Sequence, residues 1–430
     1  MRGAILAPLL DVTERRGEPA DNVGEGGSVT RRVAAVTIGW LGISMLADGV
    51  PAVLLPHQLL SAGDEGASTL GLVSMAALAA AAAVQPPAGR VSDAIGRWPV
   101  VTAGVVLAVV GLLLLTSSAA LPGAVLAMVG VSVAQAGYQP LLPDVVPRKN
   151  RGTASGFKSA IDVAGATLGF LILATILSAG ASLTATLILA TALAVPLATA
   201  SLLLRDRSAR PQEGRRSVGV AGIGGGPPST LVALVVARFF FLLGIFGVGR
   251  FLLLFVADRL SLEADAAAAQ AGAALGILAL VTVAASVPAG WLADRLGRRA
   301  LMLTGGIIAA AGIGLLATAS SVAMVVAFGA LMALGSAAFS SASWAALTDL
   351  TPSADAGRLL GLANLGTAGA AAAAGAFGLL IDVFNAGGGR AGYAVAFGLA
   401  AAASLVGGSL AWRSVPTASF GSARLSEVPR

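Results

Sequence analysis

The chain has 430 residues, of which 57% are hydrophobic and only 11% are charged. A water-soluble globular chain carries about 25% charged residues, so this composition excludes an ordinary soluble domain and predicts an all-α protein that lies mostly within a membrane. The net charge of +6 comes from basic residues in short segments between apolar runs. That distribution is typical of a membrane protein, and we expect no nucleic-acid partner.

The chain has no cysteine and one histidine, His57. These counts exclude a disulfide framework and a thiolate metal site, and they disfavour zinc chemistry and a Ser-His-Asp arrangement. We therefore expect no metal, no cofactor and no enzymatic activity.

Twelve apolar runs are long enough to cross a bilayer as helices, in which the backbone satisfies its own hydrogen bonds. Residues 1–32 and 413–430 are predicted to be tails, and 205–229 to be a linker between six-helix bundles at 33–204 and 230–412. The predicted spans are 33–59, 68–88, 99–118, 121–142, 158–180, 183–204, 230–257, 269–289, 300–318, 322–346, 358–382 and 391–412.

Lysine and arginine gather in alternate loops of this twelve-span arrangement. Examples are Arg31 and Arg32 before the first span, Arg97 after the second, and Arg298 after the eighth. Because basic loops stay on the cytoplasmic side, we expect both termini in the cytoplasm and the chain in the inner (plasma) membrane.

One loop sequence occurs twice. GRVSDAIGRW begins at Gly89, and GWLADRLGRR begins at Gly290, 201 residues later. A second segment, DVVPRKNRGTASG from Asp144, recurs as DLTPSADAGRLLG from Asp349, 205 residues later. Two matches at nearly one spacing predict two similar halves. Since each half has an even number of spans, we expect parallel repeats related by an axis along the membrane normal.

The repeated loop resembles the signature loop of the major facilitator superfamily. The second copy is complete, whereas the first has Ala94 and Trp98 at two of the usual basic positions. The resemblance implies an alternating-access secondary transporter, acting as a monomer in the lipid bilayer. The segments PDVVPRKNRGTASGFKSAIDVAG and RFFFLLGIFGVGRFLLLFVADRL are similar, more weakly, to the sucrose-proton symporter and glycoside-pentoside-hexuronide groups, which implies a sugar substrate.

The residue types of these loops suit a latch between helix ends. A glycine lets a helix end approach a neighbouring backbone, an aspartate can accept N–H groups from a facing helix N-terminus, and arginines can bind carboxylates or lipid phosphates. The alternative is a tight turn with positive anchors. The candidate gate residues are Gly89, Asp93, Gly96, Arg97, Asp144, Arg151, Asp162, Gly290, Asp294, Arg295, Gly297, Arg298, Arg299 and Asp349.

Asp48 and Arg250 stand near the middle of the first and seventh spans, 202 residues apart. A charge at that depth costs at least about 2.5 kcal/mol, so we expect both to face a central cavity at matching depths. They could couple substrate to protons by changing partners, or form a static ion pair.

Three more polar residues have simpler interpretations. Asp162 follows Lys158 by one turn, which predicts an ion pair or a gate contact. We expect Arg238 to extend to the membrane surface and His57 to form a hydrogen bond near the outer end of the first span.

Neutral polar side chains offer candidate substrate contacts. Gln135, Tyr138 and Gln139 lie within one turn of the fourth span, and the tenth span has a similar patch. Amides beside an aromatic ring suit a sugar, and they also suit an aromatic drug. The candidate substrate-binding residues are Gln135, Tyr138, Gln139, Ser340, Ser343, Trp344 and Asn364.

These observations predict proton-coupled symport of a sugar or glycoside as the function. Efflux of a drug-like compound or another metabolite by proton antiport is the alternative. A membrane receptor or scaffold that does not transport is a more remote one, and it would have no need of a charge such as Asp48 in the middle of a span.

Overall fold

The computed structural model describes residues 22–63, 66–116, 119–145, 151–208, 229–349, 366–386 and 391–415, and within these ranges the chain forms helices and no strand. The N-terminal half contains α2 (Asn22–Gly49), η1 (Val50–Leu54), α3 (Leu55–Ser61), α4 (Ala67–Ile95), α5 (Arg97–Leu115), α6 (Ala120–Tyr138), α7 (Leu141–Val145), α8 (Arg151–Leu177) and α9 (Ser182–Ser208). The C-terminal half contains α10 (Ser229–Leu260), α11 (Ala264–Leu296), α12 (Arg298–Leu316), α13 (Val322–Asp349), η3 (Ala374–Ala376), α15 (Phe377–Asn385) and α16 (Gly392–Ser414).

Eleven helical segments in the described ranges are long and apolar enough to cross a membrane, and α8 adds a shorter apolar stretch, Ile161–Leu177. Each lies on one of the twelve predicted spans, which confirms the prediction of an all-α membrane protein. The largest difference at a helix start is in α2, which begins at Asn22, eleven residues before the predicted span at 33. The helix α8 also begins early, at Arg151, seven residues before the predicted span at 158. The added residues are mostly polar or glycine, so no apolar pattern indicated a helix there.

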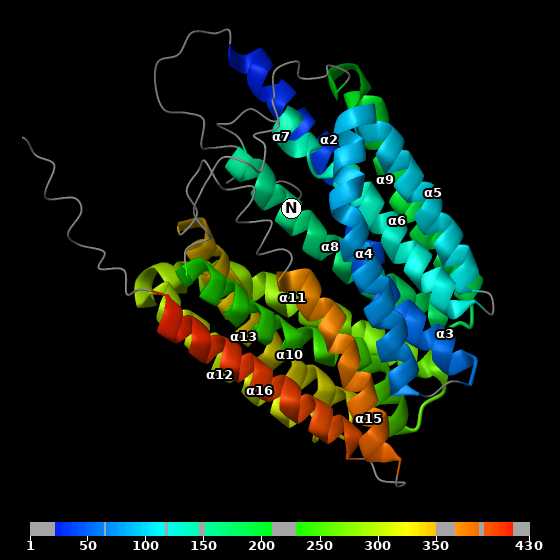
Figure 1. Ribbon diagram of the computed structural model, residues 1–430, viewed down its shortest axis with the longest axis vertical. Helices are drawn as coiled ribbons and strands as arrows, with labels where there is room; N and C mark the ends of the chain where they lie inside the picture. The colour runs from blue at the N-terminus through cyan, green and yellow to red at the C-terminus, as the bar shows by residue number, and fades with distance from the viewer. Residues whose placement is uncertain are drawn as a thin grey trace, which may run out of the picture.

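The helices form two bundles that meet along one side of each (Figure 1). In the N-terminal bundle α5 and α4 pack on α6, and α2 packs on α8 and α9. The C-terminal bundle has α12 packed on α13 and α16, with α10 against α16. Small residues allow these close contacts: a Cβ at Gly104 of α5 would lie 2.3 Å from the backbone nitrogen of Ala134 in α6. The two-bundle architecture predicted from the repeats is confirmed.

The two ends of the molecule differ, and we name them by what they carry. The "motif end" is where α4 turns into α5 at Gly96 and α11 turns into α12 at Gly297. The "seam end" is the opposite one, where α4 begins at Ala67 and α11 begins at Ala264. Contacts between the bundles include α11 with α8 and α4 with α15, and Figure 1 shows α15 beside the lower end of α4.

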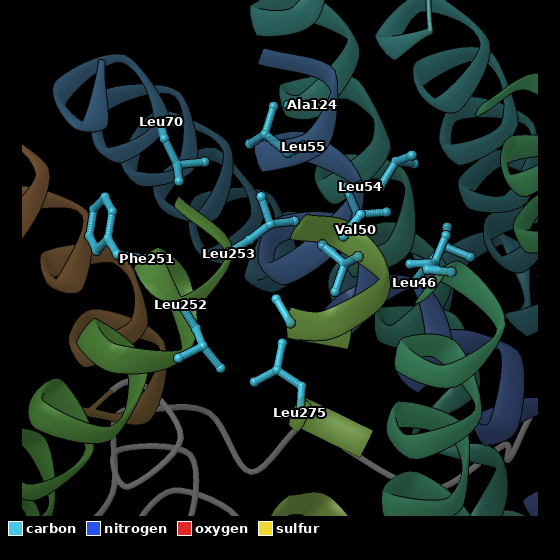
Figure 2. Close-up of a cluster of buried hydrophobic side chains, with 14 of the residues drawn as sticks. Leu46, Val50, Leu54, Leu55, Leu70, Ala124, Phe251, Leu252, Leu253 and Leu275 are labelled. Carbon is cyan, nitrogen blue, oxygen red and sulfur yellow. The ribbon is translucent and has the colours of Figure 1, made fainter. Parts of the chain in front are cut away.

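An apolar cluster fills the space between the bundles near the seam end. Val50 and Leu54 of the first crossing lie there beside Leu253 of α10 and Leu275 of α11 (Figure 2). Removing such a side chain from water contributes about 1.5–3 kcal/mol to stability, and here the packing also excludes solvent from the contact between the bundles. The bundles are therefore joined by a dry contact on one side of the membrane midplane.

The first crossing changes its helical form just after Asp48. It continues from α2 into a π-helical segment, η1, which has Pro51 in its first turn. Proline has no N–H to donate, so it interrupts the α-helical hydrogen-bond ladder at this depth. Irregular π turns are frequent at functional sites. The proline in the middle of a span was the sequence signal for this feature.

Candidate functional site

A cavity of about 380 Å³ lies between the N-terminal bundle and the crossing that contains η3 and α15. Its polar wall comes from α4, α6 and α8, and its other wall from the start of the eleventh crossing. The lining side chains are Trp40, Ala47, Leu78, Ala82, Gln85, Met128, Val131, Ser132, Gln135, Gln139, Lys158, Thr367, Ala368 and Ala371. Two predicted substrate contacts, Gln135 and Gln139, are thus part of the cavity wall.

The amide groups of the cavity are held in place by each other. Gln85 Nε2 of α4 donates to Gln135 Oε1 of α6 at 3.3 Å. Such a pair still has free donor and acceptor capacity on both side chains. It therefore offers a solute hydroxyl both kinds of hydrogen-bond partner.

Asp48 is exposed although it lies in the middle of the first crossing. Its carboxyl interacts electrostatically with Asp162 of α8 in its own bundle and with Arg250 of α10 in the other. Charges from both bundles therefore surround the same space, and Asp48 faces the interval between the bundles and not the acyl chains.

Arg250 is 6% exposed, and its Nε and Nη1 atoms have no hydrogen-bond partner among the described residues. Its guanidinium interacts electrostatically with Asp48, yet the two form no ion pair within 4 Å. The sequence predicted that the two charges share a depth and a cavity, and the structure brings them near each other without contact. Leaving the donors of a buried guanidinium unpaired destabilises this conformation, and a conformation in which they gain a partner would be favoured by comparison.

A second cluster of polar side chains lies between α2 and α8, beginning at Ser44, one helical turn before Asp48. Lys158 Nζ bonds Asp162 Oδ2 at 2.6 Å, and Ser44 Oγ donates to Asp162 Oδ1 at 3.1 Å. The lysine also lies 3.8 Å from the centre of the Trp40 ring. The predicted i,i+4 pair is present, and its cation and the ring both line the cavity.

The seam end is held by two carboxylates of the C-terminal bundle. Asp382 of α15 accepts hydrogen bonds from the backbone N–H groups of Ala67 and Ser68 at 3.0 and 2.7 Å, so it caps the N-terminus of α4. Asp265 of α11 bonds His57 Nε2 at 2.8 Å. His57 is hydrogen-bonded near the outer end of the first crossing, as expected, and its ring is buried. No sequence pattern distinguished Asp265 or Asp382 from other loop carboxylates.

Backbones touch directly at the same end. A Cβ at Gly71 of α4 would lie 2.1 Å from the carbonyl oxygen of Gly375, and one at Gly375 would lie 2.3 Å from that of Gly71. The bundles therefore meet there at a separation that only glycine permits.

The repeated loops turn at equivalent glycines. Gly96 has φ +100° and Gly297 has φ +86°, and each separates two helices. Arg97 bonds Ser92 at 3.2 Å, pairs with Asp93, and reaches Asp144 of α7 at 3.4 Å. Arg298 Nη1 donates to the carbonyl oxygen of Ala345 at 2.8 Å. The arginine thus holds the loop to the following helices in both halves.

Two details of the predicted latch are wrong. Gly89 and Gly290 approach no backbone within the described part of the chain, because a Cβ at either would meet none of its atoms within 4 Å. Asp93 in the last turn of α4 pairs with Arg97, the first residue of α5, and among the described residues it accepts no hydrogen bond from a facing helix N-terminus. At the motif end, the described residues of the opposite bundle do not contact Gly89 or Gly290. The side chains of Arg151, Asp294 and Asp349 lie outside the described part of the chain.

The glycines of the loop should therefore differ in their effect on stability. We expect Gly96→Ala and Gly297→Ala to lower the free energy of unfolding by about 1–3 kcal/mol each, because an L side chain is strained at these φ values. Gly89→Ala and Gly290→Ala are the matched controls, and they should be neutral or stabilising by about 0.5–1 kcal/mol, because both positions are helical and open. Thermal unfolding in detergent measures all four, and equal shifts would contradict this account.

Two predicted substrate contacts are buried structural residues. Tyr138 is 0% exposed; its hydroxyl accepts from the backbone N–H of Gly39 at 3.2 Å and donates to Ala35 O at 3.4 Å. Ser343 is also 0% exposed, and it donates to Ser340 O. Their side chains point into the bundles, which the spacing along a helix could not decide. Neither residue is a contact for a solute here.

The polar patch of α13 does not line the cavity described above. Ser340, Ser343 and Trp344 are absent from its wall, and Asn364 lies outside the described residues. Instead, Arg238 Nη1 of α10 donates to Ser343 Oγ, and its guanidinium lies 4.6 Å from the centre of the Trp344 ring. Arg238 is 4% exposed, so the expectation that it extends to the membrane surface is wrong. Its partners stand more than a hundred residues later, where no local pattern connects them.

Known structures resemble most of this chain in fold. A crystal structure of a bacterial homologue of the lysosomal transporter Spinster, inward-facing and occupied, has a TM-score of 0.69 at 17% identity and covers 90% of this chain and 97% of that one. A bacterial homologue of the iron transporter ferroportin gives 0.68 at 17%, covering 90% and 99%. The inward-open xylose transporter XylE from E. coli gives 0.68 at 16%, covering 91% and 98%. No match was found among curated protein sequences.

The family model of the Major Facilitator Superfamily matches this chain twice, at residues 39–256 and 239–429. The first match covers the N-terminal bundle and most of α10, the second covers the C-terminal bundle from within α10 onward, and each includes one copy of the repeated loop. A transporter, and not an enzyme, is what this family and these folds indicate. The chain is therefore a member of the Major Facilitator Superfamily, as the repeated loops predicted.

Proposed function

We propose that this transporter couples the movement of a small polar solute, a sugar or glycoside, to protons by alternating access. The observation that carries the proposal is the exposed Asp48 carboxyl in the middle of the first crossing, within electrostatic range of charges from both bundles. A carboxylate at that depth is costly, and it is retained where it has a task.

The task of Asp48 follows from its neighbours. The affinity of a carboxylate for a proton changes when a cation approaches it or leaves it. Arg250 belongs to the opposite bundle and has unused donors, so movement of one bundle against the other changes its distance to Asp48. Rearrangement of the bundles would thereby load or release a proton.

Alternating access is supported by the unequal ends. Hydrogen bonds, glycine contacts and apolar packing join the bundles at the seam end, whereas the cavity lies toward the motif end, where Gln139 and Lys158 are found. Relatives of this fold rock their bundles about a central site. We infer that the motif end faces the cytoplasm, with both termini, because its loops carry most of the basic residues. The chain would work as a monomer in the inner (plasma) membrane.

The substrate class follows from the cavity wall. Gln85, Gln135 and Gln139 supply amide donors and acceptors beside the Trp40 ring, a combination that suits a sugar. Among the similar structures, one is described as a D-xylose-proton symporter. An apolar part of the wall, including Leu78, Met128 and Val131, favours the second candidate, efflux of a drug-like compound by proton antiport.

Transport assays in proteoliposomes test both candidates. Radiolabelled mono- and disaccharides, aryl glycosides and cationic dyes are offered with and without an imposed pH gradient. We expect a sugar or glycoside to accumulate when the outside is acidic, and to move only down its own gradient otherwise. Movement of dye alone would favour antiport, and movement of none of the compounds under either condition would contradict both proposals.

A further inference from the structure

The two copies of the repeated loop have different residues, with different contacts, at two of their positions. The arginines that both copies share, Arg97 and Arg298, each bond within their own bundle, Arg97 to the Asp144 carboxylate and Arg298 to the carbonyl oxygen of Ala345. The shared arginine is therefore used inside each bundle.

The C-terminal copy has two additional arginines. Arg295 stands where the first copy has Ala94, and Arg299 stands where it has Trp98. In the first copy Trp98 packs inward, with its ring 6.3 Å from that of Tyr138. The interior role of that position has been lost in the second half, which has a guanidinium there instead.

Both additional arginines lie on tryptophan rings and not on carboxylates. The Arg295 guanidinium is 3.6 Å from the centre of the Trp291 ring, and the Arg299 guanidinium is 4.1 Å from that of Trp412. Neither forms an ion pair with a carboxylate in the described ranges. Arg299 Nε is covered and has no hydrogen-bond partner there. Two positive charges are thus held in fixed orientations with no carboxylate partner among the side chains that the structure describes.

The position of these arginines in the membrane indicates which kind of anion would neutralise them. Arg298 and Arg299 begin α12, and an apolar run starts directly after them at Ala300, which places these arginines at the edge of the hydrocarbon layer. Trp291 is 55% exposed and Trp412 37% exposed, and tryptophan is enriched at the depth of the lipid headgroups. The first turn of α12 has no acidic residue and no side-chain cap, so its positive end adds to the arginine charge.

We propose that Arg299 on Trp412 and Arg295 on Trp291 form a binding surface for the phosphate headgroups of acidic phospholipids. The planar guanidinium presents paired N–H donors that match phosphate oxygens, and stacking on a ring fixes its plane beforehand. The exposed tryptophans and Leu296 would lie against the acyl chains. The surface is separate from the transport cavity and belongs to the C-terminal bundle alone.

The test uses the purified full-length protein in a non-ionic detergent, with phosphatidylglycerol or phosphatidylcholine added. Native mass spectrometry counts retained lipids, and thermal unfolding gives their effect on stability. We expect phosphatidylglycerol to be retained and to raise the melting temperature more than phosphatidylcholine does. Arg299→Gln together with Arg295→Gln should weaken phosphatidylglycerol binding by about tenfold or more, which corresponds to about 1.4 kcal/mol.

Arg90→Gln is the control for loss of charge outside this surface, and it is compared with the single variant Arg299→Gln as well as with the double variant, because it removes one positive charge at the motif end of the other bundle. Its phosphatidylglycerol binding should equal that of the unaltered protein. Equal retention of the two lipids by the unaltered protein would overturn the proposal, even if the double variant fails to fold. So would equal losses in the control and the double variant. An excess of inorganic phosphate that stabilises the protein as much as phosphatidylglycerol would also overturn it, because it would indicate a free-phosphate site.

Discussion

Asp48→Asn should abolish concentrative transport while leaving exchange of substrate across the membrane. Asparagine has nearly the shape of aspartate and keeps this position polar, but it cannot bind or release a proton in the physiological range. The variant should therefore equilibrate substrate and fail to accumulate it when a pH gradient is imposed. Its exchange rate should also lose the pH dependence that the unaltered protein shows.

The measurement compares uptake driven by a pH gradient with substrate exchange at equal pH in the same proteoliposomes. Glu263→Gln is the control, because Glu263 is an exposed carboxylate at the start of α11 and makes no side-chain cap there. It should accumulate substrate as the unaltered protein does. Accumulation by Asp48→Asn against a substrate gradient would remove Asp48 from the coupling mechanism.

Gly71→Ala should shift the transporter toward the conformation that is open at the seam end. The added Cβ would lie 2.1 Å from the carbonyl oxygen of Gly375 in the opposite bundle, and a backbone atom cannot move aside alone. The overlap exists only while the two bundles are in contact at the seam end. It destabilises that state, and a difference of about 1.4 kcal/mol already changes the ratio of the two conformations tenfold.

Thiol labelling in vesicles of known orientation measures this shift. The chain has no cysteine, so Ala82→Cys in the cavity wall supplies a single reactive site. In the Gly71→Ala background, we expect slower labelling from the motif end and faster labelling from the seam end. Gly314→Ala, where a Cβ would meet nothing within 4 Å, is the matched control and should change neither rate. Unchanged rates in the Gly71→Ala protein would show that the seam does not open.

The fold was predictable because its signals are long or repeated. Apolar runs identify the crossings, and the copies at Gly89 and Gly290 identify the two halves. The depth of Asp48 and Arg250 followed from their places within spans. These are properties that a linear pattern carries directly, since a helix rises by a fixed length per residue.

The contacts between distant helices were less predictable, because spacing along a helix gives depth but not the neighbour that a face meets. Tyr138 and Gln139 are adjacent in sequence, yet one is buried against Gly39 and the other lines the cavity. Asp382 caps a helix more than three hundred residues earlier, and no local feature announces it. Arg238 was misjudged for the same reason, since its partner Ser343 belongs to another helix.

The motif glycines show how one residue type can have several uses. Gly96 and Gly297 are required by a positive φ, and Gly71 by a backbone contact between the bundles. Gly89 and Gly290 meet neither condition in this conformation. Residue type alone does not distinguish the roles of these five glycines, so only the backbone geometry shows which of them cannot be replaced by a larger residue.

The central claim is that the two bundles rock about the space between them that Asp48 faces, so that this space opens at one end of the molecule at a time. Spin labels at Ile95→Cys and Leu296→Cys test it most directly, because these exposed residues end α4 and α11 at the motif end, one in each bundle. We expect the distance between the labels, measured by double electron–electron resonance, to be long at rest and to shorten when transported substrate and an acidic pH are supplied. A distance that stays constant in protein that is actively transporting would contradict the account.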